Sequence, residues 1–140
     1  MVRIETQPGY VLHARSYRET SLLLDVFTKD YGRLGVIARG VKGARGQAQR
    51  AALQPMQPLL ISCSGHGELL RLTSAEPAGA ALILQGDSLL CGFYLNELVM
   101  RLLPRNEAFE SLFWRYAACL GQLTEESIER AWELRRFERD

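Results

Sequence analysis

The residues of this chain that could do chemistry are cations rather than catalytic groups. Between Asp30 and Glu68 the sequence has no acidic residue, but it has five basic ones: Arg33, Arg39, Lys42, Arg45 and Arg50. Cations without nearby carboxylates keep their attraction for an external anion, because no internal partner neutralises them. The stretch therefore favours a polyanion with regularly spaced phosphates as the ligand. A solvated basic loop without any ligand is the plain structural alternative.

Patterns that would indicate catalysis are missing from the sequence. There is no G-x-S-x-G, no P-loop, no H-E-x-x-H and no Cys/His pair placed for nucleophilic attack. The three cysteines are isolated and the two histidines are scattered, so no set of metal ligands is indicated: Cys63, Cys91, Cys119, His13 and His66. We expect the cysteines to be buried apolar side chains. We expect neither an enzyme nor a cofactor or metal site.

Strand periodicity predicts how the basic residues are positioned. Five short extended segments occupy residues 10–17, 20–28, 33–39, 58–63 and 68–74. A longer connection, which carries most of the cations, follows the third segment. This spacing predicts a five-stranded OB-fold barrel over residues 1–77, and an SH3-like barrel fits the spacing nearly as well. On such a barrel aromatic rings can stack on bases, and the candidates are Tyr10, Tyr17 and Tyr31, although strand aromatics more commonly fill the core.

From residue 78 onward the apolar period becomes helical. Asp87 and Ser88 can cap a first helix, which carries Phe93 and Tyr94 on its expected core face and stops at Pro104. A second helix is predicted from Asn106 to Gly121, and a third from Thr124 onward. Residues 78–140 are therefore expected to be the incomplete start of a helical domain. The fold class is mixed, β then α.

Charge is divided unevenly between the two halves. Residues 1–50 have nine Lys/Arg and four Asp/Glu, which gives +5, and residues 51–140 have eight and twelve, which gives −4. Such a division suggests surfaces with different partners. The N-terminus lacks the apolar core of a signal peptide, and no apolar run reaches membrane-spanning length. We expect a cytoplasmic protein without a membrane partner.

An ordered series of short motifs resembles the bacterial RecO recombination-mediator family. The motifs occur in the order and spacing of that family, and together they run across essentially the whole chain: Glu19-Thr-Ser21, Asp25-Val-Phe-Thr28, Gly32, Ala38-Arg-Gly40, Leu53-Gln-Pro55, Gly67-Glu68, Ala75-Glu76, Tyr94-Leu-Asn-Glu-Leu98 and Arg136-Phe-Glu138. The resemblance implies an N-terminal OB-fold, a helical domain and no enzymatic activity. Arg39 and Lys42, with Arg45 close behind, sit where the family has a DNA-contacting Ala-Lys/Arg-Gly-x-Arg stretch.

The resemblance also implies a function and partners. Family members act in the RecF pathway of DNA repair, bind single- and double-stranded DNA, anneal complementary strands and, with RecR, help to load RecA onto DNA coated by single-strand-binding protein. They continue well beyond the length of this chain, so we expect the helical site for the acidic tail of single-strand-binding protein to be incomplete here. A member would work in the bacterial cytoplasm, at the nucleoid. A protein-interaction module without enzymatic activity and an RNA-binding OB domain are the alternatives that the residues leave open.

Overall fold

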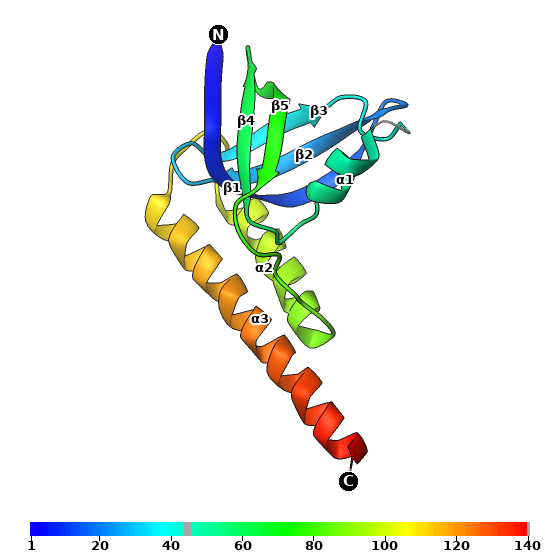
Figure 1. Cartoon of the computed structure of the whole chain (residues 1–140). Helices are drawn as coiled ribbons and strands as arrows, with labels where there is room; N and C mark the ends of the chain where they lie inside the picture. The colour runs from blue at the N-terminus through cyan, green and yellow to red at the C-terminus, as the bar shows by residue number, and fades with distance from the viewer. Residues whose placement is uncertain (44–45, 140) are drawn as a thin grey trace.

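Strand periodicity in the first half of the chain produces a closed five-stranded barrel (Figure 1). The computed structural model describes residues 1–43 and 46–139, with residues 131–139 described by their backbone alone. The strands are β1 (Val2–Tyr17), β2 (Ser21–Thr28), β3 (Gly32–Ala38), β4 (Leu59–Gly65) and β5 (Leu69–Pro77). They close in the order β1-β2-β3-β5-β4, and β3 runs parallel to β5. This order with its parallel contact is that of the OB-fold, so the predicted OB-fold is confirmed over the SH3-like alternative.

Inward-facing apolar side chains fill the barrel. Alternate residues of a strand point to opposite faces, and the buried set on β3 is Leu34, Val36 and Ala38. Residues of the other strands complete this core, with Leu24 and Val26 from β2 among them. The same alternation leaves Gly35 and Ile37 on the outer face of β3, followed by the exposed Arg39 just beyond the strand.

The first strand, β1, is longer than the sequence predicts, because it pairs with two neighbouring strands. Its first part pairs with β4 and its second part with β2, and Gly9 pairs with Leu59 and Thr28 at the point of transfer. A Cβ atom on Gly9 would lie 2.9 Å from Ile61 Cδ1, so the missing side chain permits close contact between the strands. The sequence predicts a start at Tyr10 because proline and glycine are depleted in strands.

Three helices accompany the barrel, and they differ from the predicted three. A short α1 (Gln47–Ala52) lies in the connection for which the sequence predicts a loop. Helix α2 (Asp87–Leu102) ends before Pro104, as predicted. The predicted break at Gly121 is wrong, because α3 (Glu110–Arg139) is a single helix. Glycine in a helix costs only about 1 kcal/mol relative to alanine. The hydroxyl of Thr124 donates to the carbonyl of Leu120 within the helix, so Thr124 does not cap a new helix. In the described part of the chain no helix combines the length and the hydropathy needed to cross a membrane.

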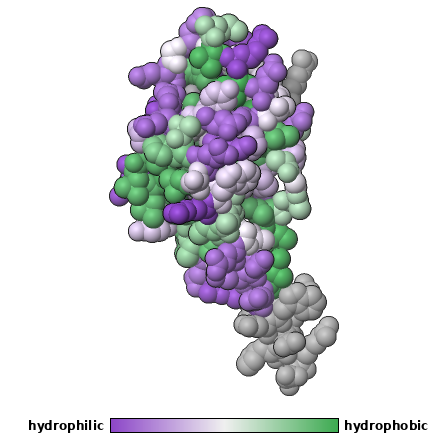
Figure 2. Space-filling model, turned by 90° about the vertical axis from the view of Figure 1, so that its left-hand side faces the viewer, coloured by the Kyte–Doolittle hydropathy of each residue, from purple (hydrophilic) through white to green (hydrophobic). Residues whose placement is uncertain are grey.

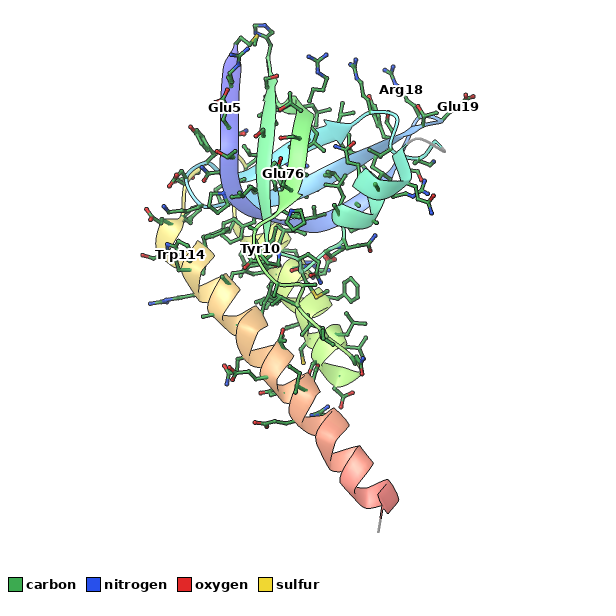
Figure 3. All side chains as sticks on the ribbon, viewed as in Figure 1. Glu5, Tyr10, Arg18, Glu19, Glu76 and Trp114 are labelled. Atoms are coloured by element: carbon green, nitrogen blue, oxygen red, sulfur yellow. The ribbon has the colours of Figure 1, made fainter. Side chains whose placement is uncertain are left out.

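An aromatic cluster joins the barrel to the helices. Tyr10 and Phe27 from the barrel contact Phe113 and Tyr116 from α3, with ring centroids 5.0–5.7 Å apart. Tyr116 donates a hydrogen bond to Asn96 of α2, which in turn donates to the carbonyl of Leu12 in β1. Figure 3 shows Tyr10 between the barrel and the helices. The helical layer is therefore packed on the barrel through a buried core of its own.

Helix α2 exposes apolar residues for which the sequence predicts a position in the core. Its buried side runs through Ser88, Gly92, Asn96 and Val99. The opposite side exposes large apolar side chains at Leu90, Phe93, Tyr94 and Leu102. The expectation that Phe93 and Tyr94 are core residues is therefore wrong. Figure 2 shows another view of the surface, on which hydrophobic residues form patches between hydrophilic ones.

The three cysteines are expected to react unequally with iodoacetamide. Cys63 is 1% exposed, and burial raises the pKa of its thiol to about 11, whereas Cys91 and Cys119 are exposed, contrary to expectation. Because the thiolate is the reacting species, peptide mass spectrometry at pH 8 should find Cys91 and Cys119 alkylated in the folded chain and Cys63 only after unfolding in guanidinium. Equal rates at all three residues in the folded protein would contradict the buried position of Cys63.

Candidate nucleic-acid interface

Arg39 lies in the middle of a groove on the outside of the barrel. Two hollows of ≈ 370 Å³ and ≈ 310 Å³ meet there, and both are lined by Ile37 and Arg39. We call the two hollows together the outer groove. Tyr17 and Arg18 from the β1–β2 hairpin line the first hollow, and residues of the β4–β5 hairpin, among them His66, Leu69 and Arg71, line the second. The groove thus runs across the end of β3 from one hairpin to the other.

Strand register brings two further arginines level with Ile37. Leu23 pairs with Arg15 of β1 and with Ile37 of β3, and Ile37 pairs in turn with Arg71 of β5. Paired residues project from the same face of a sheet, so these four form one row across four strands. The arginines at its ends are exposed and the two apolar residues between them are half-buried. Cations beside an apolar strip can hold phosphates while bases contact the strip, as single-stranded nucleic acid requires.

The electrostatics of the outer groove favour an anion. Among the described residues, neither hollow is lined by an aspartate or a glutamate. Glu19 projects from the same hairpin tip as Arg18 (Figure 3), and both side chains are exposed to solvent there. The guanidinium groups of Arg39 and Arg71 therefore have no carboxylate beside them within the groove, and they keep their attraction for an external polyanion.

The described members of the five basic residues predicted to contact phosphates have different surroundings. Arg39 lines the outer groove, and Arg45 lies outside the described residues. In the connection after β3, Lys42 is bonded through its backbone and Arg50 through its side chain. The backbone N–H of Lys42 donates to the carbonyl of Thr20 at 3.0 Å, and Arg50 Nη1 donates to the carbonyl of Val41 at 3.2 Å. The guanidinium of Arg50 is thus engaged within the protein.

The sequence predicts that no carboxylate neutralises Arg33, and for this residue the prediction is wrong. Arg33 Nη1 donates to Asp25 Oδ1 at 3.1 Å, Nε donates to the carbonyl of Leu103, and both charged side chains are 13% exposed. Asp25 precedes the acid-free stretch in sequence, but it lies on the adjacent strand β2, where it pairs with Gly35. Arg33 is therefore a structural link between the barrel and the end of α2, not a free phosphate ligand.

The three candidate stacking tyrosines have different surroundings. Tyr10 is 7% exposed within the aromatic cluster, so its assignment to base stacking is wrong. Tyr17 lines the outer groove, with Arg18 Cζ 5.3 Å from the centre of its ring. Tyr31 is exposed in the β2–β3 turn, which lies at the other end of β3 from Arg39. Tyr17 is therefore the aromatic candidate that the fold brings to the groove cations.

Sequence reasoning missed Arg15, Arg18 and Arg71. All three lie outside the acid-free stretch, and no local charge cluster marks them. For Arg15 and Arg71 the signal is the alternation of the strands, since Arg71 follows the inward-facing Leu70 and must point outward. Arg18 lies in the turn between β1 and β2, where alternation gives no signal. Aligning Arg71 with Ile37 requires the parallel pairing of β3 with β5, which alternation alone does not reveal.

The described residues include three buried titratable groups and no candidate metal site. No cluster of three or more His, Cys, Asp or Glu side chains with metal-binding geometry occurs among them. Burial raises the pKa of Tyr10 and of Tyr116, and the raised pKa of Cys63 keeps that thiol neutral near pH 7. These three groups are buried and uncharged there, which fits a role in packing.

Comparisons with known proteins find relatives over nearly the whole chain. The family model described as "Recombination protein O N terminal" matches residues 1–81, and "Recombination protein O C terminal" matches residues 84–140. The chain is 51% identical over 139 residues to the DNA repair protein RecO of Nitrosococcus oceani, covering 99% of this chain and 56% of that protein. It is 50% identical to that of Xanthomonas euvesicatoria, covering 98% and 57%, and 48% identical to that of Cupriavidus metallidurans, covering 99% and 46%. The chain thus spans about half the length of these relatives.

Proposed function

The chain belongs to the RecO family of DNA repair proteins, and from this premise we propose that its OB-fold barrel binds single- and double-stranded DNA along the outer groove. The observation that carries the proposal is the position of Arg39 between two hollows that, among the described residues, have no carboxylate in their lining. Arg18 flanks it on one side and Arg71 on the other. A phosphate backbone along this path would meet successive cations.

The groove is suited to contact that does not depend on base sequence. Its charged groups are arginines, which neutralise phosphates, and its apolar surface at Ile37 and Leu69 can contact any base. Neutralising phosphates on two strands lowers their mutual repulsion and lets complementary bases pair. We therefore propose strand annealing as the activity, with no covalent step and hence no enzymatic role.

Membership of the family is the support for the proposed partners. We propose that the chain acts in homologous recombination through the RecF pathway, and that with RecR it promotes loading of RecA onto DNA coated by single-strand-binding protein. Such a role would place it in the bacterial cytoplasm. The chain spans 56% of the length of the Nitrosococcus oceani protein, so each proposed partner is to be tested with this chain itself.

A protein-interaction module is the second candidate function. The observation that favours it is the exposed apolar side of α2, where Leu90, Phe93 and Tyr94 are 67%, 47% and 67% exposed. Exposed apolar patches commonly mark protein interfaces. Strand annealing by the isolated chain would favour the mediator, whereas binding to RecR or single-strand-binding protein without any DNA binding would favour the module.

The salt dependence of DNA affinity tests the proposed function. Arg15, Arg18, Arg39 and Arg71 lie in or beside the outer groove, so about four phosphate contacts on single-stranded DNA should give a slope of log affinity against log salt of about −2.8. Fluorescence anisotropy with labelled single-stranded DNA at several salt concentrations measures this slope. The same titrations with duplex DNA and with RNA of matched length show which nucleic acid binds most tightly. A slope near zero would contradict the phosphate contacts, and a clear preference for RNA would favour the RNA-binding alternative.

A further inference from the structure

Arg105 reaches the outer face of the barrel from the helical part of the chain. It lies between α2 and α3, and its backbone forms a bridge with Arg33 of β3. A Cβ atom built on Gly35 would lie 3.5 Å from Arg105 Nη1 and 2.9 Å from Leu69 Cδ2. The guanidinium therefore lies over Gly35 and close to Leu69, a residue that lines the outer groove.

The position of Arg105 extends the cationic path of the outer groove. Gly35 is two residues from Ile37 and four from Arg39 along β3, which corresponds to about 6.6 Å and about 13 Å in a strand. All three project from, or lie on, the same outer face. A single strand of nucleic acid that contacts Arg39 and Arg71 therefore needs only a short extension along β3 to reach Arg105.

One carboxylate oxygen holds two arginines at this point. Asp25 Oδ1 accepts from Arg33 Nη1 at 3.1 Å and from Arg105 Nη2 at 3.2 Å. The two partners differ in exposure, because the side chain of Arg33 is 13% exposed and that of Arg105 is 39% exposed. Arg33 also donates to the carbonyl of Leu103, which fixes it in place. Asp25 would thus keep a charged partner if Arg105 turned toward another anion.

We propose that Arg105 is a further phosphate ligand of the outer groove and that Asp25 competes with DNA for it. The proposal rests on the proposed function, because it needs nucleic acid in the groove. A phosphate accepts paired hydrogen bonds from a guanidinium, whereas Asp25 shares a single oxygen between two guanidinium groups. Nucleic acid therefore draws Arg105 away from Asp25, and the α2–α3 connection becomes part of the binding surface.

A double-mutant cycle on the full chain tests both halves of the proposal. Arg105→Gln should weaken binding to single-stranded DNA about 5-fold near 0.1 M salt and reduce the salt slope by about 0.7. Asp25→Asn should strengthen binding by a similar factor, and the gain should vanish in the Asp25→Asn/Arg105→Gln double variant. Arg115→Gln, on the exposed surface of α3, is the matched control and should leave the affinity unchanged.

The outcomes separate this proposal from the proposed function. If Arg105→Gln leaves affinity and slope unchanged while Arg39→Gln lowers both, Arg105 is no ligand and the proposal is overturned, but DNA binding in the groove stands. If neither variant changes binding, the groove itself is excluded. A gain from Asp25→Asn that persists without Arg105 overturns the competition. Should Asp25→Asn fail to fold, the ¹⁵Nε resonance of Arg105 in the native chain tests the competition instead. We expect this resonance to shift when single-stranded DNA is added. An unchanged resonance would mean that Arg105 stays on Asp25 and would overturn the proposal.

Discussion

Replacing Arg39 and Arg71 together by glutamate is expected to weaken single-stranded DNA binding at least 25-fold near 0.1 M salt, a rough figure for two lost phosphate contacts. Arg71 lines the hollow from β5 and Arg39 lines it from just beyond β3, so the double variant reverses two charges within one hollow. Both side chains are exposed, so folding should be unaffected. The slope of log affinity against log salt should fall in magnitude by about 1.4, equally for strands of different base sequence.

A charge-matched control distinguishes the groove from the overall charge of the chain. Arg101→Glu/Arg115→Glu changes the net charge by the same amount, on α2 and α3 instead of on the barrel. Both of these arginines are exposed. Anisotropy titrations of the two double variants should show the large loss only for Arg39 and Arg71. An equal loss in both would mean that binding follows net charge, and it would remove the groove from the interface.

The barrel could be predicted from the sequence because its strands carry a local signal. On β3 the alternation of Leu34, Val36 and Ala38 gives both the strand and its inward face, and the same signal recurs in the other strands. Gly121 shows where local signals mislead. Glycine is typical of helix ends, but here α3 continues through it, because Leu120 just before it is buried in the cluster shared by the barrel and the helices. Leu123 just after it packs against the same cluster. Tertiary packing outweighs a local cost of about 1 kcal/mol.

The candidate site could be predicted only in part, because charge pairing depends on distance in space. The acid-free stretch drew attention to Arg39, which lines the outer groove, but Asp25 on the neighbouring strand pairs with Arg33. Conversely, Arg15 and Arg71 are far apart in sequence, and the register of four strands places them at the two ends of one row. The sequence predicts a segment without carboxylates. Among the described residues, it is the lining of the groove that has none, and most of its members come from outside that segment.

Truncating Phe113 to alanine is expected to produce the largest loss of stability in the chain. Phe113 is 1% exposed and contacts Tyr10 and Phe27 of the barrel at ring distances of 5.7 and 5.4 Å. Removing a buried aromatic ring costs about 3–5 kcal/mol, since apolar burial is lost and a cavity remains. For a chain of 140 residues this corresponds to a fall in the melting temperature of about 10–17 °C. Tyr94→Ala, an aromatic truncation at 67% exposure on α2, should change stability by no more than about 0.5 kcal/mol.

The shape of the unfolding transition shows whether the aromatic cluster couples the two layers. Phe113 lies on α3, but its ring contacts two barrel strands, so its loss should destabilise the barrel and the helices together. Circular dichroism at 222 nm reports the helices, and the near-ultraviolet signal reports the tyrosines, of which Tyr10 and Tyr116 lie in the cluster. Both signals should move to the same lower midpoint in Phe113→Ala. Two separate midpoints would mean that the barrel is stable without its helical layer, and the path from Arg39 to Arg105 would then cross between independently folding parts.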